Sequence, residues 1–151
     1  MPRPPDRSNA KVVVQANVSR IAYEHACELL AVPMQPSFRS FSQMTETLLF
    51  LAQHACYEQA GDAFARRLLQ CKASALLDIS DLTVRMTYRR LSLTLDVQAR
   101  DFLVNFTARY PGLCSTKGEA LELLYTHAGF IRRQREAYLA QRLCDVMLLH
   151  P

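Results

Sequence analysis

The stretch YRRLSLTLDVQARDFLVNF, residues 88–106, changes its hydrophobic period part-way along. Its first half alternates, with Leu91, Leu93 and Leu95 on one side and polar residues on the other, as in a half-buried β-strand. After Asp96 the apolar residues take helical spacing, and Asp96 is itself a suitable N-cap. A lone strand cannot satisfy its own backbone, so a partner strand must lie elsewhere in the chain.

The partner strand is predicted in KVVVQANVSRIAYEHACELL, residues 11–30, which shows the same alternation. Val12, Val14, Ala16 and Val18 form its apolar side, and Ser19 stands in the N-cap position that Asp96 holds in the later copy. The helix after each strand is expected to bury an apolar stripe. The stripes are Ala22, Ala26, Leu29 and Leu30 in the early copy and Ala99, Phe102, Leu103 and Phe106 in the later copy.

A second helix is predicted behind a serine in each copy. FRSFSQMTETLLFLA (38–52) aligns with LCSTKGEALELLYTH (113–127), which places Ser40 against Ser115. The strands are 77 residues apart and the second helices 75, so the turn between helices is expected to be two residues longer in the early copy. Two strand–helix–helix copies in one chain indicate an internal repeat; the alternative is a chance likeness of short amphipathic segments.

Composition permits a single domain and excludes several classes of function. The 151 residues carry a net charge of +4, which allows a polyanionic partner without requiring one. No apolar run approaches the roughly 18 residues that span a bilayer, and residues 1–10 lack the apolar core of a secretion signal. We therefore expect a flexible N-terminal tail, no membrane association and a cytoplasmic protein.

No motif in the chain indicates catalysis or metal binding. The cysteines are odd in number and never at C-x-x-C spacing, so they are expected to be buried thiols in a reducing compartment; they are Cys27, Cys56, Cys71, Cys114 and Cys144. The sequence has no nucleophile elbow, phosphate loop or zinc signature. We expect a protein that is not an enzyme, with no catalytic residues, cofactor or metal.

The order of strand, capped helix and serine-led second helix resembles the ribbon-helix-helix family of DNA-binding proteins. Its members normally dimerise, and each subunit gives one strand to an antiparallel ribbon. The segments PSFRSFSQMTETLLFLA, KASALLDISDLT and YPGLCSTKGEALELL are most similar to the T-DNA transfer enhancer proteins of the VirC operon, which carry two such repeats in tandem. The resemblance implies a mainly α fold, a tandem ribbon-helix-helix pseudo-dimer within one monomeric chain.

The resemblance also implies a DNA interface. A two-stranded ribbon fits the major groove, so the polar side of the strands would contact bases through Val13, Gln15, Asn17, Arg90, Ser92 and Thr94. Phosphates would be held by cations and by the free amides of the second helices, with the residues Lys11, Arg89, Ser40, Ser42, Ser115, Thr116 and Lys117. The plainer alternatives are a solvated strand face and simple N-capping.

The role that follows is accessory: binding double-stranded DNA at an enhancer near a border or origin, with a relaxase and a partner ATPase as protein partners. Because the two strands differ, the two half-sites are expected to differ in sequence. A repressor or plasmid partition protein of the same fold is one alternative, and a helical protein–protein adaptor is another.

The expected organisation is a tail (1–10), repeat one (11–56), a helical connector (57–87), repeat two (88–128) and a C-terminal helix (129–150). Basic clusters are predicted to be solvated, with phosphate or partner contact as the alternative; they are Arg66, Arg67 and Lys72, then Arg85 and Arg89, then Arg132, Arg133 and Arg135. The remaining apolar helical residues are expected in the core, namely Leu68, Leu69, Leu76, Leu77, Ile131, Leu139 and Leu143.

Overall fold

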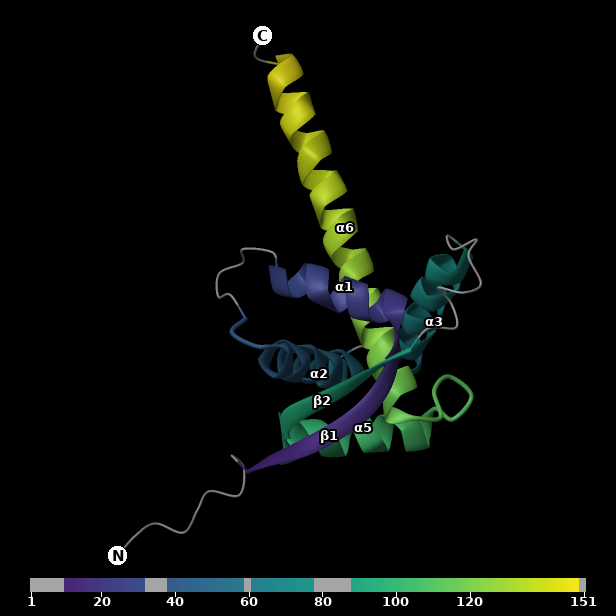
Figure 1. Ribbon diagram of the computed structural model, residues 1–151. Coiled ribbons are helices and arrows are strands. Elements are labelled where there is room, and N and C mark those ends of the chain that lie inside the picture. Colours follow the sequence, from purple (N-terminus) through teal and green to yellow (C-terminus); the bar gives the residue numbers. More distant parts are fainter. Residues whose placement is uncertain (1–9, 32–37, 59–60, 78–87, 150–151) are drawn as a thin grey trace, which may run out of the picture.

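The computed structural model describes residues 10–31, 38–58, 61–77 and 88–149. Within these ranges the protein is mainly helical with one two-stranded sheet (Figure 1). The elements in order are β1 (Lys11–Ser19), α1 (Arg20–Ala31), α2 (Phe41–Glu58), α3 (Gly61–Leu77), β2 (Tyr88–Asp96), α5 (Val97–Arg109) and α6 (Lys117–Leu149). The expected tail lies outside the described residues apart from Ala10, and the expected connector contains α3.

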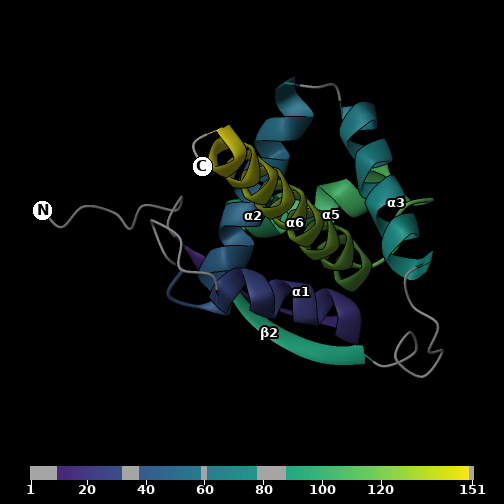
Figure 2. The same cartoon turned by 90° about the horizontal axis from the view of Figure 1, so that it is seen from above.

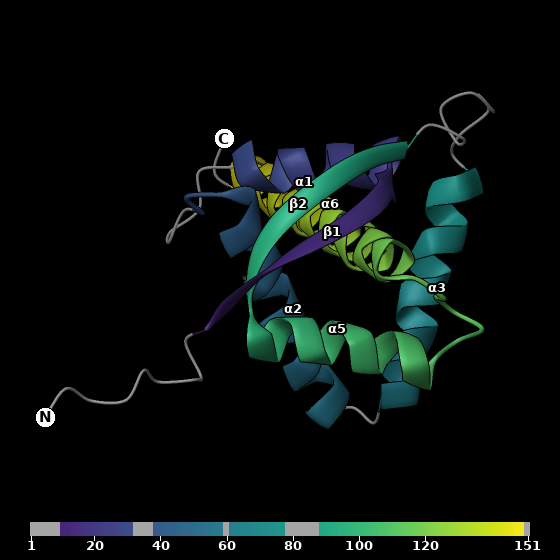
Figure 3. The ribbon, with the colours of Figure 1, turned by 60° about the horizontal axis from the view of Figure 1, so that its bottom comes forward.

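The two strands pair with each other, although more than 60 residues separate them in the chain. β1 and β2 are antiparallel over their full length, with Lys11 opposite Asp96 and Ser19 opposite Tyr88. The strand prediction and the pairing prediction are therefore confirmed. Figure 3 shows this ribbon in front of the helices, which cover only its other face. The covered side buries the alternating apolar residues Val14, Ala16, Val18, Leu91, Leu93 and Leu95.

The core lies between this buried ribbon face and the helices. Figure 2 shows α1, α2 and α3 arranged around α6. The expected stripes face inward: Ala22, Ala26 and Leu29 are buried in α1 and Leu103 and Phe106 in α5. The middle of the core holds a polar pair, because the buried hydroxyls of Thr45 and Tyr125 lie 2.7 Å apart. Each hydroxyl thereby keeps a hydrogen bond away from water.

The last helix differs from the expected boundary between repeat two and a separate C-terminal helix. α6 is continuous over 33 residues, and residues 128 and 129 lie within its first half. Gly129 does not end the helix. A Cβ at this position would lie 2.5 Å from Nδ1 of His25, so the glycine permits the close approach of α6 to α1. Beyond this contact α6 projects away from the rest of the molecule (Figure 1).

Several residues expected in the core are exposed instead. Leu68 is buried, but Leu69, Ile131, Leu139 and Leu143 are each about half exposed or more. Periodicity identifies an apolar stripe on a helix but not whether another element covers it, and α6 is longer than the body it packs on. Of the cysteines expected to be buried, Cys71 and Cys114 are buried, Cys27 and Cys56 are partly buried, and Cys144, on the same projection, is exposed. The side chains of Leu76 and Leu77 lie outside the described residues.

None of the helices that the structure describes, α6 included, combines the length and apolar character needed to cross a membrane.

Two histidines are expected to make the fold sensitive to acid. Burial first, and then Arg133, lowers the pKa of His25 below 6.5, although Glu28 and Glu24 oppose this; burial and Arg67 lower that of His127. The unfolded chain therefore takes up protons near pH 6.5 that the folded chain binds only at lower pH. The contribution of these histidines to the free energy of unfolding is therefore complete above pH 6.5. Below pH 6.5 the free energy of unfolding falls by at most about 1.4 kcal/mol per pH unit for each histidine.

Urea unfolding between pH 7 and pH 5 measures this dependence. A variant carrying His25→Gln and His127→Gln should show a shallower loss of stability over the same range. An unchanged slope in that variant would show that the two histidines do not cause the loss.

Candidate nucleic-acid interface

The outer face of the ribbon gathers all six residues predicted to contact bases. They form three cross-strand pairs, and every one is exposed: Val13 with Thr94, Gln15 with Ser92, and Asn17 with Arg90. Val13 is 64% exposed, which is unusual for a branched apolar side chain in the middle of a strand. No helix or strand in the described ranges covers this face. Strand parity alone placed these residues together, because alternate side chains point to opposite faces.

Arg90 is held in place by a neighbour on the other strand. Its Nη2 donates a hydrogen bond to Oε1 of Gln15, which lies diagonally across the ribbon. The bond uses the carbonyl oxygen of Gln15, so its amide nitrogen can still donate, as can the other N–H groups of the exposed Arg90 guanidinium. The sequence assigned these two side chains separate contacts with bases, and no sequence signal specifies the bond between them. The pair presents a donor-rich surface near one end of the ribbon.

The N-terminus of α2 carries the cap that the sequence predicted. Oγ of Ser40 accepts a hydrogen bond of 3.1 Å from the backbone N–H of Gln43. The Gln43 side chain in turn accepts one from the backbone N–H of Arg39, at 2.6 Å. The exposed Arg39 was not among the predicted phosphate contacts, and its cation lies just before a helix whose first turn has no acidic residue. This end of α2 suits an anion.

The cap of α6 is one residue later than predicted. Oγ1 of Thr116, rather than the Ser115 side chain, accepts the capping hydrogen bond, from the backbone N–H of Glu119 at 3.2 Å. Ser115 instead donates from its backbone to the Glu119 carboxylate at 2.9 Å. Ser40 is therefore equivalent to Thr116. From first cap to second cap the early copy is one residue longer, but α1 is one residue shorter than α5, so the early turn between helices is two residues longer, as predicted. Glu119 places negative charge at this helix start, so Lys117 is the cation available there.

Both second helices begin directly beside the ribbon, one at each end. Oγ of Ser42 accepts a hydrogen bond of 3.0 Å from the backbone N–H of Thr94, so this hydroxyl serves the strand edge. At the other end, a Cβ on Gly118 would lie 2.0 Å from the carbonyl oxygen of Asn17. The start of α6 thus touches the backbone of β1. Two helix N-termini flank the exposed ribbon face as a result.

A hollow of about 330 Å³ lies where the start of α6 meets the outer face of the ribbon. It unites residues predicted for two kinds of DNA contact. Those predicted to contact bases are Gln15, Asn17 and Arg90, and those predicted to contact phosphate are Thr116 and Lys117.

The other predicted phosphate contacts already have partners. Nζ of Lys11 lies 2.8 Å from Glu46 and 2.9 Å from Asp96, and hydrogen bonds to these carboxylates raise the pKa of Lys11 above its usual value. The guanidinium of Arg89 lies 4.3 Å from the ring centre of Tyr23. Arg89 stays exposed, whereas Lys11 would have to leave two carboxylates to reach a phosphate.

The caps of the first helices are unlike each other. Oγ of Ser19 accepts a hydrogen bond of 3.3 Å from the backbone N–H of Ala22, which confirms it as the N-cap of α1. Asp96 stands in the same position before α5, but its side chain makes no capping hydrogen bond. Its carboxylate pairs with Lys11 instead.

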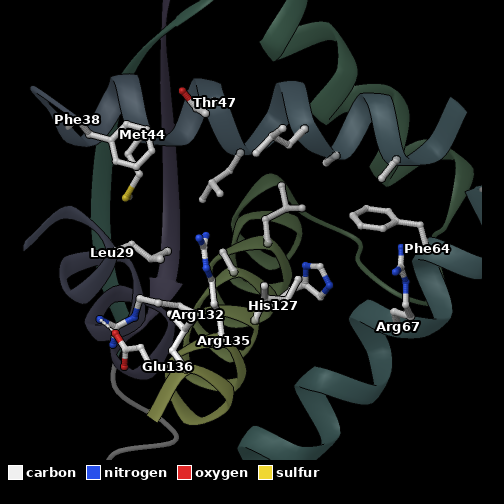
Figure 4. Close-up of a pocket in the computed structure, with 18 residues that line it drawn as sticks. Leu29, Phe38, Met44, Thr47, Phe64, Arg67, His127, Arg132, Arg135 and Glu136 are labelled. Atoms are coloured by element: carbon white, nitrogen blue, oxygen red, sulfur yellow. Dashed lines mark ion pairs between the residues drawn. The ribbon is translucent and has the colours of Figure 1, made fainter. Parts of the chain in front are cut away.

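An apolar groove of about 800 Å³ lies away from the ribbon, between α1, α2, α3 and α6 (Figure 4). Aliphatic and aromatic side chains line it, and Arg67, Arg132, Arg135 and Glu136 stand among them. Arg132, which was predicted to be solvated, is instead partly buried and pairs with Glu28 at 2.9 Å. Among the described residues, no three His, Cys, Asp or Glu side chains gather as they would to hold a metal ion. The groove has the form of a surface that takes an amphipathic helix.

Comparison of the chain with protein-family models, with curated proteins and with solved structures found no match. The geometry of the ribbon and the chemistry of its outer face are therefore the observations that bear on function.

Proposed function

We propose that this protein binds double-stranded DNA in a sequence-specific manner, as a tandem ribbon-helix-helix pseudo-dimer within one chain. The observation that carries the proposal is the ribbon: two distant segments pair antiparallel and expose six side chains on one face. A two-stranded ribbon has the dimensions of the major groove, where each base pair shows a distinct pattern of donors and acceptors. Arg90 suits guanine, Asn17 suits adenine, and Val13 suits the methyl group of thymine.

Helix starts at both ends of the ribbon support this proposal. In a ribbon docked in the major groove, the flanking phosphates would lie near the N-terminus of α2 and that of α6. Backbone amides and the positive end of the helix dipole favour an anion at the start of α2, whereas at the start of α6 the Glu119 carboxylate opposes one. Arg39 adds a cation at α2 and Lys117 adds one at α6. These contacts would position the protein, while the ribbon would supply specificity.

The biological role within this proposal is accessory, in the processing and transfer of T-DNA or conjugative DNA. The protein would bind an enhancer near a border or origin and assist a relaxase and a partner ATPase. This role rests on the resemblance of residues 36–52, 72–83 and 110–124 to transfer enhancer proteins. A repressor or partition protein would use the same interface, and gel shifts with border-region DNA against operator and random duplexes separate these roles.

Arg90→Ala is expected to weaken specific DNA binding by about 1–3 kcal/mol, or roughly five- to 150-fold, because a bidentate contact with a base is lost. Arg142→Ala is the matched control, since it removes the same charge from the exposed distal part of α6. Fluorescence anisotropy at stated salt measures both variants, and circular dichroism checks that they fold. Equal affinities for the two variants would remove Arg90 from the interface.

A helical adaptor is the second candidate, favoured by the apolar groove and by the exposed apolar residues of α6. The two functions differ in their dependence on salt. DNA binding should lose about 0.9 log units of affinity per log unit of salt for each phosphate contact. An adaptor that binds through the groove would bury apolar surface, and its affinity would change little with salt. A flat salt profile together with no preference for duplex DNA would favour the adaptor.

A further inference from the structure

The two ends of the ribbon have different chemistry. At one end, Val13 and Thr94 offer methyl groups and a single hydroxyl, and the neighbouring Lys11 is matched by two carboxylates. At the other end, Asn17 and Arg90 offer an amide and a guanidinium beside Lys117. The first end is apolar, and its cations Lys11 and Arg39 are matched in number by Glu46 and Asp96. The second end is polar and cationic, because Arg90 and Lys117 outnumber Glu119.

These two ends are too far apart to contact the same base pair. Val13 and Asn17 are four residues apart on one strand, so they lie about 13 Å apart along the ribbon. Successive bases on a DNA strand rise by roughly 3.4 Å. The centre of the ribbon, where Gln15 faces Ser92, separates the two ends. Each end therefore contacts its own part of a DNA site.

The chemistry of each end selects a different base. The C5-methyl of thymine is the apolar group in the major groove, and Val13 with the Thr94 methyl offers it a matching contact. Guanine shows two acceptors, O6 and N7, which a guanidinium can bind with two hydrogen bonds. Arg90 is pre-positioned for this by its hydrogen bond to Gln15. Asn17 beside it suits adenine.

We propose that the DNA site is asymmetric, with two unlike halves. A thymine-containing half lies against the Val13–Thr94 end beside α2, and a guanine-containing half lies against the Asn17–Arg90 end beside α6. This inference rests on the proposed function. It also sets the orientation of the protein on DNA. The internal twofold relation exchanges Val13 with Arg90 and Asn17 with Thr94, so reversed docking would place a valine against the guanine acceptors. Those acceptors would then lose water without gaining donors, which is costly.

The experiment uses a duplex selected by the full-length protein from a random library. Each thymine is replaced in turn by deoxyuridine, which lacks the methyl, and each guanine by 7-deazaguanine, which lacks the N7 acceptor. For the unaltered protein, one or more deoxyuridines in one half should weaken binding about three- to fivefold. A 7-deazaguanine in the other half should weaken it about tenfold or more.

Two variants assign these losses to residues. Val13→Ala should lose its sensitivity to deoxyuridine and keep its sensitivity to 7-deazaguanine, and Arg90→Ala should show the reverse pattern. Val104→Ala, at an exposed valine on α5, and Arg142→Ala are the matched controls and should keep both sensitivities.

Three results would overturn the inference. The first is that deoxyuridine and 7-deazaguanine weaken binding in the same half of the site. The second is that Val13→Ala or Arg90→Ala changes the response to base substitutions in both halves. The third is that the selected duplex is a palindrome. In those cases salt-dependent, sequence-specific binding would still leave the proposed function standing. If the protein bound no selected duplex more tightly than a random duplex, both the asymmetric site and the proposed function would be wrong.

Discussion

Gly118→Ala is expected to destabilise the protein by about 3 kcal/mol, although alanine is the better helix former. Gly118 lies in the first turn of α6, where an added Cβ would come 2.0 Å from the carbonyl oxygen of Asn17. That oxygen belongs to the strand backbone and cannot rotate away as the end of a side chain could. The start of α6 would have to move off β1. The steric cost should exceed the gain of roughly 1 kcal/mol from helix propensity.

Urea denaturation followed by circular dichroism measures this change. Gly112→Ala is the matched control, because a Cβ there meets no atom within 4 Å, and its stability should change by less than about 0.5 kcal/mol. A stabilised Gly118→Ala protein would show that α6 does not touch the strand. The same variant should also bind DNA less tightly under the proposed function, since the displaced helix carries Thr116 and Lys117.

The strands were predictable because apolar and polar residues alternate over a short stretch of sequence. Leu91, Leu93 and Leu95 alternate with polar residues, so parity decides which side chains are buried and which are exposed. Pairing followed from the backbone, since each strand had no other partner. The same parity placed the six residues of the outer face together before the register was known. This part of the candidate site followed from sequence.

The phosphate contacts were less predictable because they depend on which partners a side chain finds. Lys11 pairs with Glu46 and Asp96, and Ser42 accepts a hydrogen bond from Thr94, contacts that join distant segments. Ser115 and Thr116 are adjacent hydroxyl residues, and only the backbone shows which of them caps α6. The exposure of Leu139 could not be foreseen either. Whether a helix extends beyond the helices that pack against it depends on the whole fold.

Two contacts that sequence analysis missed occupy matching positions in the two proposed copies. Oε1 of Glu46, on α2, accepts a hydrogen bond of 2.7 Å from the backbone N–H of Asp96. Oε1 of Glu122, on α6, accepts one from the backbone N–H of Ser19. Ser19 and Asp96 are the equivalent residues just before α1 and α5. Each second helix therefore binds the strand–helix junction of the other half.

The correspondence of these two hydrogen bonds could have been predicted by aligning Ser40 with Thr116, because Glu46 then aligns with Glu122. It has a consequence for stability, since each carboxylate joins one half of the chain to the other. The two hydrogen bonds should stabilise the association of the halves at both ends of the ribbon. An antiparallel pair of nine-residue strands puts these ends about 26 Å apart.

Glu46→Ala and Glu122→Ala are each expected to lower the free energy of unfolding by about 2 kcal/mol, because a hydrogen bond to a charged acceptor is lost and a strand-end N–H loses its partner. The double variant should lose about 4 kcal/mol, since sites so far apart are independent. Glu24→Ala is the control: it removes an exposed carboxylate paired with Arg20 and should cost about 0.5 kcal/mol or less. Urea denaturation of the unaltered protein and of these four variants tests this. Losses no larger than that of the control would show that these carboxylates add nothing to the ribbon hydrogen bonds and the core that join the halves. A double variant that unfolds in two steps would show that the carboxylates make the two halves one cooperative unit.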